Sequence, residues 1–215
     1  MDSTKPKIRS LTDWLRAQFK PMLDPLGRFI GRIGLHPNVI TVLGLIGNVI
    51  GAAVLGLGNI TLGGVIILLM GPVDALDGAT ARASGQKSPF GAFVDSVTDR
   101  YSEAITFLGL LFYYLRQPDN DAAMILIFLS FVGSVMVSYA KARGEALSFD
   151  VNVGLLTRLE RYLIIAPLLI FNQPMIMLWI VAILSNFTAL QRIFHVRRQW
   201  YGRKADDQHP ERKPE

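Results

Sequence analysis

The chain alternates long apolar runs with short polar stretches, and six of the runs have about the length of a membrane-spanning helix. A helix needs about 20 apolar residues to cross a hydrocarbon core about 30 Å thick. The pattern therefore predicts an all-α, polytopic membrane protein with six transmembrane helices. The predicted spans cover residues 37–57, 60–82, 91–115, 121–141, 159–173 and 174–196.

The segment before the first span has a different pattern. Residues 8–33 mix apolar and basic positions at helical spacing, which predicts an amphipathic helix in the membrane interface, interrupted at Pro21 or Pro25. We therefore predict three regions. They are an arm with this interfacial helix at 1–36, a six-helix transmembrane domain at 37–200, and a charged, disordered tail at 201–215.

Composition supports a membrane protein and limits its metal chemistry. The chain is 51% hydrophobic and 18% charged, whereas soluble domains carry about a quarter charged residues. There is no cysteine, so disulfides and thiolate metal sites are excluded. The histidines His36, His195 and His209 have no metal-ligand spacing. A bound metal would need oxygen ligands, as Mg²⁺, Mn²⁺ and Ca²⁺ prefer.

The distribution of basic residues predicts the topology. The formal net charge is +5, but the basic residues form no single patch of the kind that binds nucleic acid. Of 22 lysines and arginines, only Arg116 lies outside the two terminal regions and the neighbourhood of the two longer loops, 83–90 and 142–158. The positive-inside rule places these loops and both termini in the cytoplasm. We expect a multi-pass protein of the cell membrane with a cytoplasmic site.

Four aspartates interrupt the apolar pattern. Asp74 and Asp77 end the second span, and Asp95 and Asp99 begin the third. Spacings of three and four residues put each pair on one helical stripe. The polar loop between the spans, 83–90, is short enough for an antiparallel pair, so all four carboxylates can converge.

Converging carboxylates repel one another unless cations or protons neutralise them. Oxygen ligands in this number suit one or two divalent cations, and paired metals recur in phosphoryl displacement. Ordinary interfacial acids would explain any single one of these residues, but not four in matched stripes, each costing about 2.5–3.5 kcal/mol to insert. A cation-binding transporter is an alternative of another class, although the chain has no visible internal repeat.

A second polar group lies at the cytoplasmic ends of spans four to six. Its members are Ser138, Lys141, Arg161 and Arg192. Membrane anchors that snorkel toward headgroups are one reading. A pocket for a phosphate-sized anion is the other, and a metal site together with such a pocket implies two anionic substrates.

The aspartates belong to a longer motif. The pattern Asp74-x₂-Asp77-Gly78-x₂-Ala81-Arg82-x₈-Gly91-x₃-Asp95-x₃-Asp99 resembles in full the signature of the CDP-alcohol phosphotransferases. The resemblance implies a membrane enzyme that moves a phosphatidyl group from CDP-diacylglycerol to an alcohol and releases CMP. It implies that the four aspartates bind two Mg²⁺ or Mn²⁺ ions, with Asp99 also the catalytic base. It assigns the CDP-lipid pocket to Gly78, Ala81, Arg82 and Gly91.

Within that family the chain is most similar to the actinobacterial-type phosphatidylinositol phosphate synthases, on the stretches SYAKARGEA, RLERY and LQR. This similarity implies inositol phosphate as acceptor, its phosphate held by Ser138, Lys141, Arg161 and Arg192, and a homodimer. Leu159 departs from the proline expected there. Glycerol 3-phosphate, as in a phosphatidylglycerophosphate synthase, is the alternative acceptor.

Overall fold

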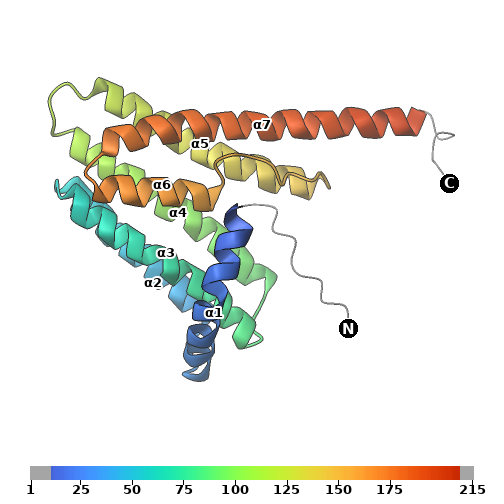
Figure 1. The fold of residues 1–215 in the computed structure, drawn as a ribbon, viewed down its shortest axis with the longest axis horizontal. Coiled ribbons are helices and arrows are strands. Elements are labelled where there is room, and N and C mark those ends of the chain that lie inside the picture. The colour runs from blue at the N-terminus through green and yellow to red at the C-terminus, as the bar shows by residue number, and fades with distance from the viewer. Residues whose placement is uncertain (1–10, 209–215) are drawn as a thin grey trace. The chain divides into compact units, whose positions relative to one another are not determined.

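A computed structural model describes residues 11–208, which form seven helices and no strand (Figure 1). This confirms the predicted all-α fold, and each predicted span overlies one helix from α2 to α7. The helices are α1 (Leu11–Arg32), α2 (Pro37–Gly56), α3 (Ile60–Ala83), α4 (Pro89–Tyr114), α5 (Asp121–Ala146), α6 (Arg158–Ile170) and α7 (Pro174–Gln208).

The chain divides into two compact units. The first holds α1, α2, α3, α4 up to Tyr113, and the short segment Leu169–Phe171. The second holds α5, α7, the rest of α6 and the loops that join them. The acidic motif therefore belongs to the first unit, and the four residues of the predicted anion pocket belong to the second.

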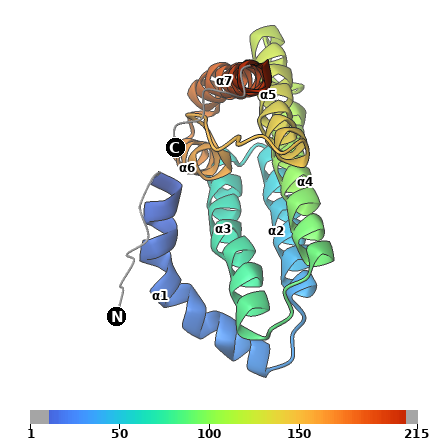
Figure 2. The same ribbon diagram turned by 90° about the vertical axis from the view of Figure 1, so that its right-hand side faces the viewer.

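In the first unit, α2 and α3 form an antiparallel pair that lies side by side in both ribbon views (Figures 1 and 2). A tight turn joins them, with Gly58 at a φ of 100°. The next residue, Asn59, caps α3 by accepting a hydrogen bond from the Leu62 amide at 3.1 Å. The turn lies between the first two predicted spans, 37–57 and 60–82. It brings the aspartates of α3 beside the first half of α2.

Helix α1 corrects one prediction. We expected an interruption at Pro21 or Pro25, but both prolines lie inside one continuous helix. Proline removes a backbone donor and favours a kink at its position. Because these prolines are four residues apart, they share one face, and α1 bends rather than breaks (Figure 2). Close packing of α1 against α3, at Gly27 beside Ala79, stabilises the bent helix.

In the second unit, α5 and α7 pack side by side along much of their length (Figures 1 and 2). Small and polar residues make the contact. Ser130 of α5 donates to the Leu178 carbonyl of α7 at 3.2 Å, and Asn186 of α7 donates to the Leu129 carbonyl of α5 at 3.0 Å. Interhelical bonds of this kind, with small residues that allow close approach, are typical of membrane helix pairs.

Within the described residues, four helices are long and apolar enough to cross a membrane: α2, α3, α5, and α7 from Pro174 to Lys204. This supports a membrane protein. The other two predicted spans, α4 and α6, are not among these four helices, and the reason is different for each. The first half of α4 carries Asp95, Asp99 and Arg100, which lower its hydropathy. Helix α6 has only 13 residues, a length of about 20 Å at 1.5 Å per residue.

The C-terminal region also departs from the prediction. The expected disordered tail begins at residue 201, but α7 continues as a helix to Gln208. Residues 1–10 of the predicted arm and 209–215 of the predicted tail lie outside the described part of the chain.

Candidate functional site

The first two motif aspartates lie in the second half of α3 and contact α2. Asp77 is only 7% exposed, and its Oδ2 accepts a hydrogen bond from Thr41 Oγ1 of α2 at 2.6 Å. Asp74 packs against Gly44, which also belongs to α2. A Cβ added to Gly44 would lie 2.6 Å from Asp74 Oδ1. A side chain at position 44 would therefore displace the Asp74 carboxylate.

Sequence reasoning missed this contribution of α2. Thr41, Gly44 and Asn48 are buried and lie at i, i+3 and i+7, which is one helical stripe. Asn48 donates to the Gly44 carbonyl within the stripe, at 2.9 Å. A run of small and polar residues on one face of an apolar span could have indicated that this face meets polar groups of a neighbouring helix.

The second aspartate pair lies in the first half of α4. Asp99 is 9% exposed, whereas Asp95 is half-buried. Arg100 Nη2 lies 3.9 Å from Asp99 Oδ2. Asp74 and Asp95 are both electrostatic neighbours of Asp77 and repel its charge. The structure thus brings Asp95 of α4 within electrostatic range of Asp77 of α3.

This donor set suits a hard divalent cation, because all the candidate ligand atoms are carboxylate oxygens. The mutual repulsion around Asp77 is also of the kind that a bound cation would relieve. The described residues nevertheless contain no group of three or more acidic or histidine side chains placed closely enough to hold a metal ion. The four-aspartate, two-metal site therefore stays a prediction.

The other motif residues lie on the same two helices. Gly78, Ala81 and Gly91 are half-buried, and Arg82 is exposed. Arg82 Nη2 lies 3.9 Å from an oxygen of Asp24 in α1, an ion pair that contributes little because both side chains contact solvent. The Gly91 amide donates to Ser88 Oγ at 2.9 Å, at the start of α4.

Helix α1 supports α3 directly behind this motif. A Cβ placed on Gly27 of α1 would lie 2.8 Å from the carbonyl carbon of Ala79 and 2.9 Å from the amide nitrogen of Thr80. Real side chains do not approach a backbone so closely, so only glycine allows the two helices to meet here. Residues 79 and 80 follow Gly78, so α1 packs on the motif itself.

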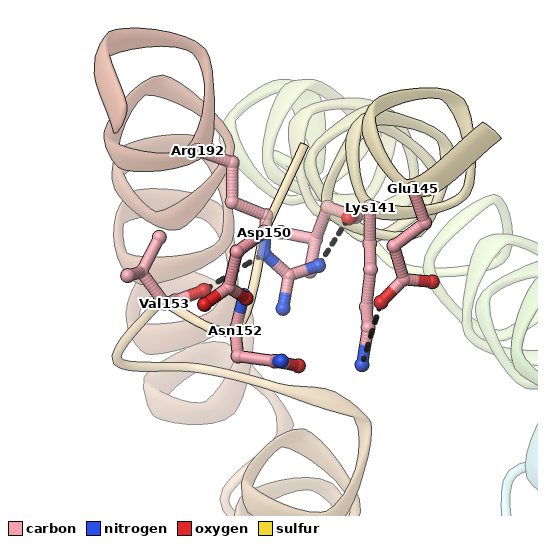
Figure 3. Close-up of polar contacts among 7 residues, drawn as sticks. Lys141, Glu145, Asp150, Asn152, Val153 and Arg192 are labelled. Atoms are coloured by element: carbon pink, nitrogen blue, oxygen red, sulfur yellow. Dashed lines mark hydrogen bonds and ion pairs between the residues drawn. The ribbon is translucent and has the colours of Figure 1, made fainter. Parts of the chain in front are cut away.

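The second unit contains two buried arginines. Arg161 of α6 is 1% exposed and Arg192 of α7 is 4% exposed. Arg161 donates to the Leu156 carbonyl at 3.2 Å. Arg192 donates from Nε to the Val153 carbonyl at 2.9 Å and from Nη1 to the Val137 carbonyl (Figure 3). The two guanidinium groups are electrostatic neighbours of like charge.

Lys141 and Ser138 complete the predicted group on α5. Lys141 Nζ lies 3.7 Å from Glu145 Oε1, one turn along α5 (Figure 3). Ser138 donates to the Ser134 carbonyl one turn earlier, at 3.3 Å. Glu145 and Glu160 are acidic electrostatic neighbours of Arg192 and act against the repulsion from Arg161. Two buried guanidinium groups still offer donors of the kind that bind an anion such as phosphate.

A family model described as CDP-alcohol phosphatidyltransferase matches residues 34–192. The chain is 36% identical to an archaetidylinositol phosphate synthase of Pyrococcus horikoshii over 186 residues, which cover 86% of this chain and 96% of the relative. It is also 36% identical to a phosphatidylinositol phosphate synthase of Streptomyces avermitilis over 203 residues, covering 88% and 83%.

The fold resembles that of a solved relative, the phosphatidylinositol phosphate synthase of Mycobacterium tuberculosis. Its structure with bound CDP-DAG aligns with a TM-score of 0.72 at 30% identity, covering 82% of this chain and 94% of the relative. Its complex with manganese and citrate aligns with a TM-score of 0.73 at 30% identity, covering 81% and 88%.

Proposed function

The chain belongs to the CDP-alcohol phosphatidyltransferase family, and we propose that it transfers a phosphatidyl group from CDP-diacylglycerol to inositol phosphate, with release of CMP. The relatives support this choice, since one is by name an archaetidylinositol phosphate synthase and another a phosphatidylinositol phosphate synthase, and the solved one binds CDP-DAG. Their names agree on the inositol phosphate and differ in the lipid part, archaetidyl or phosphatidyl. The acceptor therefore has stronger support than the lipid.

One observation carries the choice of a phosphorylated acceptor: Arg161 and Arg192 are both buried and close enough to repel each other. An acceptor phosphate between them would compensate this repulsion and accept charge-assisted hydrogen bonds. Lys141 would add a third positive charge, and Ser138 a hydroxyl donor. An acceptor without a phosphate, such as inositol or serine, would bring no such anion to Arg192, whose charge Glu145 and Glu160 also stabilise.

In this proposal, Asp74, Asp77, Asp95 and Asp99 hold two divalent ions, Mg²⁺ or Mn²⁺. When bound, these cations would neutralise the diphosphate and stabilise the departing CMP. The chemical character of the carboxylates supports the assignment, and so does the manganese in the relative's structure. Asp99 would accept the proton of the acceptor hydroxyl, a role that needs only modest tuning of a carboxylate.

The reaction is a displacement at phosphorus. The acceptor oxygen bonds to the phosphorus that carries diacylglycerol, the bond from that phosphorus to the CMP oxygen breaks, and the proton passes to Asp99. Gly78, Ala81, Arg82 and Gly91 would form the pocket for the CDP part. The small residues leave room for the ligand beside the backbone, and Arg82 offers its guanidinium to the diphosphate.

The proposed enzyme crosses the membrane six times, with α4 and α6 as the two less apolar spans. Both termini and the site would lie in the cytoplasm, which the distribution of basic residues supports. We further propose that it acts as a homodimer. Chemical crosslinking in native membranes would test the dimer: a crosslinked species at twice the mass of 23.8 kDa is expected.

An acceptor panel tests the function. Purified protein in lipid nanodiscs receives CDP-diacylglycerol, Mg²⁺ and one acceptor, and CMP release is measured. The acceptors are inositol phosphate, glycerol 3-phosphate, inositol and serine. We expect turnover with inositol phosphate. If glycerol 3-phosphate is the one acceptor that supports turnover, it replaces inositol phosphate as the proposed acceptor. If none of the four acceptors supports CMP release, the proposal is overturned. Ion flux in liposomes without nucleotide dependence would instead support a transporter.

A further inference from the structure

The loop between α5 and α6, residues 147–157, is fastened along α7 by side chains of that helix. Thr188 Oγ1 accepts from the Leu156 amide at 3.0 Å, and Arg192 Nε donates to the Val153 carbonyl at 2.9 Å. Gln199 and Arg203 bind the loop further along α7. These four residues lie at i, i+4, i+11 and i+15. Since eleven residues make about three turns, they share one face of α7.

Among the hydrogen bonds that join this loop to the described part of α7, only those of Gln199 run in both directions, with one accepted and one donated. Its Oε1 accepts from the Asp150 amide at 3.1 Å, and its Nε2 donates to the Asp150 carbonyl. The amide group of a glutamine side chain has one acceptor and one donor end, so it pairs with both backbone groups of one residue. This contact fixes the position of Asp150 and the direction of the chain through it.

Position 150 lies three residues before Val153, whose carbonyl holds Arg192. Asp150 Oδ1 accepts from the Asn152 amide at 3.1 Å, a local turn that restricts the chain directly before Val153 (Figure 3). Val151 is fully buried and packs against Gly144 of α5. The segment from Asp150 to Val153 is thus held as one piece, and a shift at its start would move the Val153 carbonyl.

The orientation of Arg192 depends on that carbonyl. The guanidinium is held from two directions, by Val153 in the loop and by Val137 in α5. These bonds use Nε and Nη1. Losing the Val153 carbonyl would leave a single bond about which the planar group could turn. Its remaining donors would then lose their fixed direction toward a bound anion.

We propose that Gln199 is a positioning residue for the acceptor phosphate. Gln199 holds the loop at Asp150 by two hydrogen bonds. The loop thereby places the Val153 carbonyl, which accepts from Arg192 and so orients its guanidinium. Gln199 lies seven residues after Arg192, about 10 Å further along the helix, so it acts through Arg192. This inference rests on the proposed function, because it assigns the acceptor phosphate to Arg192.

The test compares variants of the full chain in nanodiscs, with whichever phosphorylated acceptor the wild type turns over. We expect Gln199→Ala to raise the KM for the acceptor about fivefold, as the loss of one or two hydrogen bonds allows. The kcat and the KM for CDP-diacylglycerol should stay unchanged. Arg198→Ala is the matched control, because Arg198 is an exposed neighbour on α7 and should leave all three constants unchanged.

Gln199→Glu is the second variant, and it keeps the acceptor for the Asp150 amide while replacing the donor with a carboxylate. It should also raise the acceptor KM, so a folding failure of the alanine variant does not leave the question open. A double-mutant cycle with Arg192→Lys tests whether Gln199 acts by positioning Arg192 or only by stabilising the fold. If Gln199 acts through Arg192, its substitution should have little further effect in that background.

The outcomes distinguish the two proposals. An unchanged acceptor KM in both Gln199 variants, or an equal rise in the Arg192→Lys background, would overturn the positioning role. An equal loss for both substrates would do the same, because it would indicate damage to the fold. If the wild type releases no CMP with any phosphorylated acceptor, the proposed function itself fails, and that result precedes any comparison of variants.

Discussion

Thr41 Oγ1 of α2 donates a hydrogen bond to Asp77 Oδ2 of α3 over 2.6 Å, and both side chains are buried. The bond orients one carboxylate of the acidic motif from a neighbouring helix. Hydrogen bonds to charged groups are the stronger ones in proteins, and buried groups depend on them most. The part of the motif on α3 therefore depends on α2 for its geometry.

Thr41→Val removes this hydroxyl while it keeps the shape of the side chain. Because a hydrogen bond to a charged group is worth about 1.5–3 kcal/mol, we expect kcat/KM to fall at least about tenfold. The Mg²⁺ concentration for half-maximal activity should rise, which a metal titration of CMP release measures. Thr41→Ser keeps the donor and should retain most activity. Equal metal dependence in the two variants would argue against this role.

Asp99→Asn removes the proposed base with little change in size. General base catalysis contributes about 10²–10⁴-fold, so turnover should fall by at least about two orders of magnitude. Binding of CDP-diacylglycerol, measured separately, should weaken much less. Asp121→Asn, at the exposed start of α5, is the matched control. Full turnover of Asp99→Asn would remove the base assignment.

Arg161→Ala tests the acceptor pocket from the second unit. Loss of a guanidinium that binds phosphate should raise the acceptor KM about tenfold or more, with a smaller change in kcat. Arg197→Ala, an exposed arginine of α7, serves for comparison and should have little effect on the acceptor KM. If Arg161→Ala leaves the acceptor KM unchanged, then Arg161 has only a structural role.

Metal removal tests the four aspartates together. EDTA should abolish CMP release, and added Mg²⁺ or Mn²⁺ should restore it, because the expected ligands are all carboxylate oxygens. Calorimetric titration with Mn²⁺ in the presence of CDP-diacylglycerol should detect binding. The heat should be lost in Asp77→Asn. Activity that persists in excess EDTA would contradict a metal-dependent reaction.

Gly27→Ala tests the packing of α1 on α3. Its Cβ would lie 2.8 Å from the backbone of Ala79, and overpacking of this kind costs about 1–3 kcal/mol. We expect a lower midpoint of thermal unfolding, followed by tryptophan fluorescence, and reduced activity. Gly202→Ala is the control, since a Cβ there would meet nothing within 4 Å. Equal unfolding midpoints in the two variants would show that the close contact between α1 and α3 at Gly27 is not needed for stability.

The sequence was a good guide to the helices and a poorer guide to their boundaries. Apolar runs predicted the positions of α2 to α7 because burial in a membrane requires long apolar segments. The same reasoning predicted a break in α1, because proline is costly inside a helix. Helix α1 packs closely on α3 at Gly27, two residues after Pro25, and such tertiary support is invisible along the chain.

The sequence by itself determined which residues share a helical stripe. Asp74 and Asp77 share a stripe because they are three residues apart on a helix, and Asp95 and Asp99 because they are four apart. Only the tertiary structure decided which groups those stripes meet. Thr41 and Asp77 are 36 positions apart, and the carbonyls that hold Arg192 lie 39 and 55 positions before it. Such partners are chosen by how helices and loops pack, and the helical repeat carries no information about that choice.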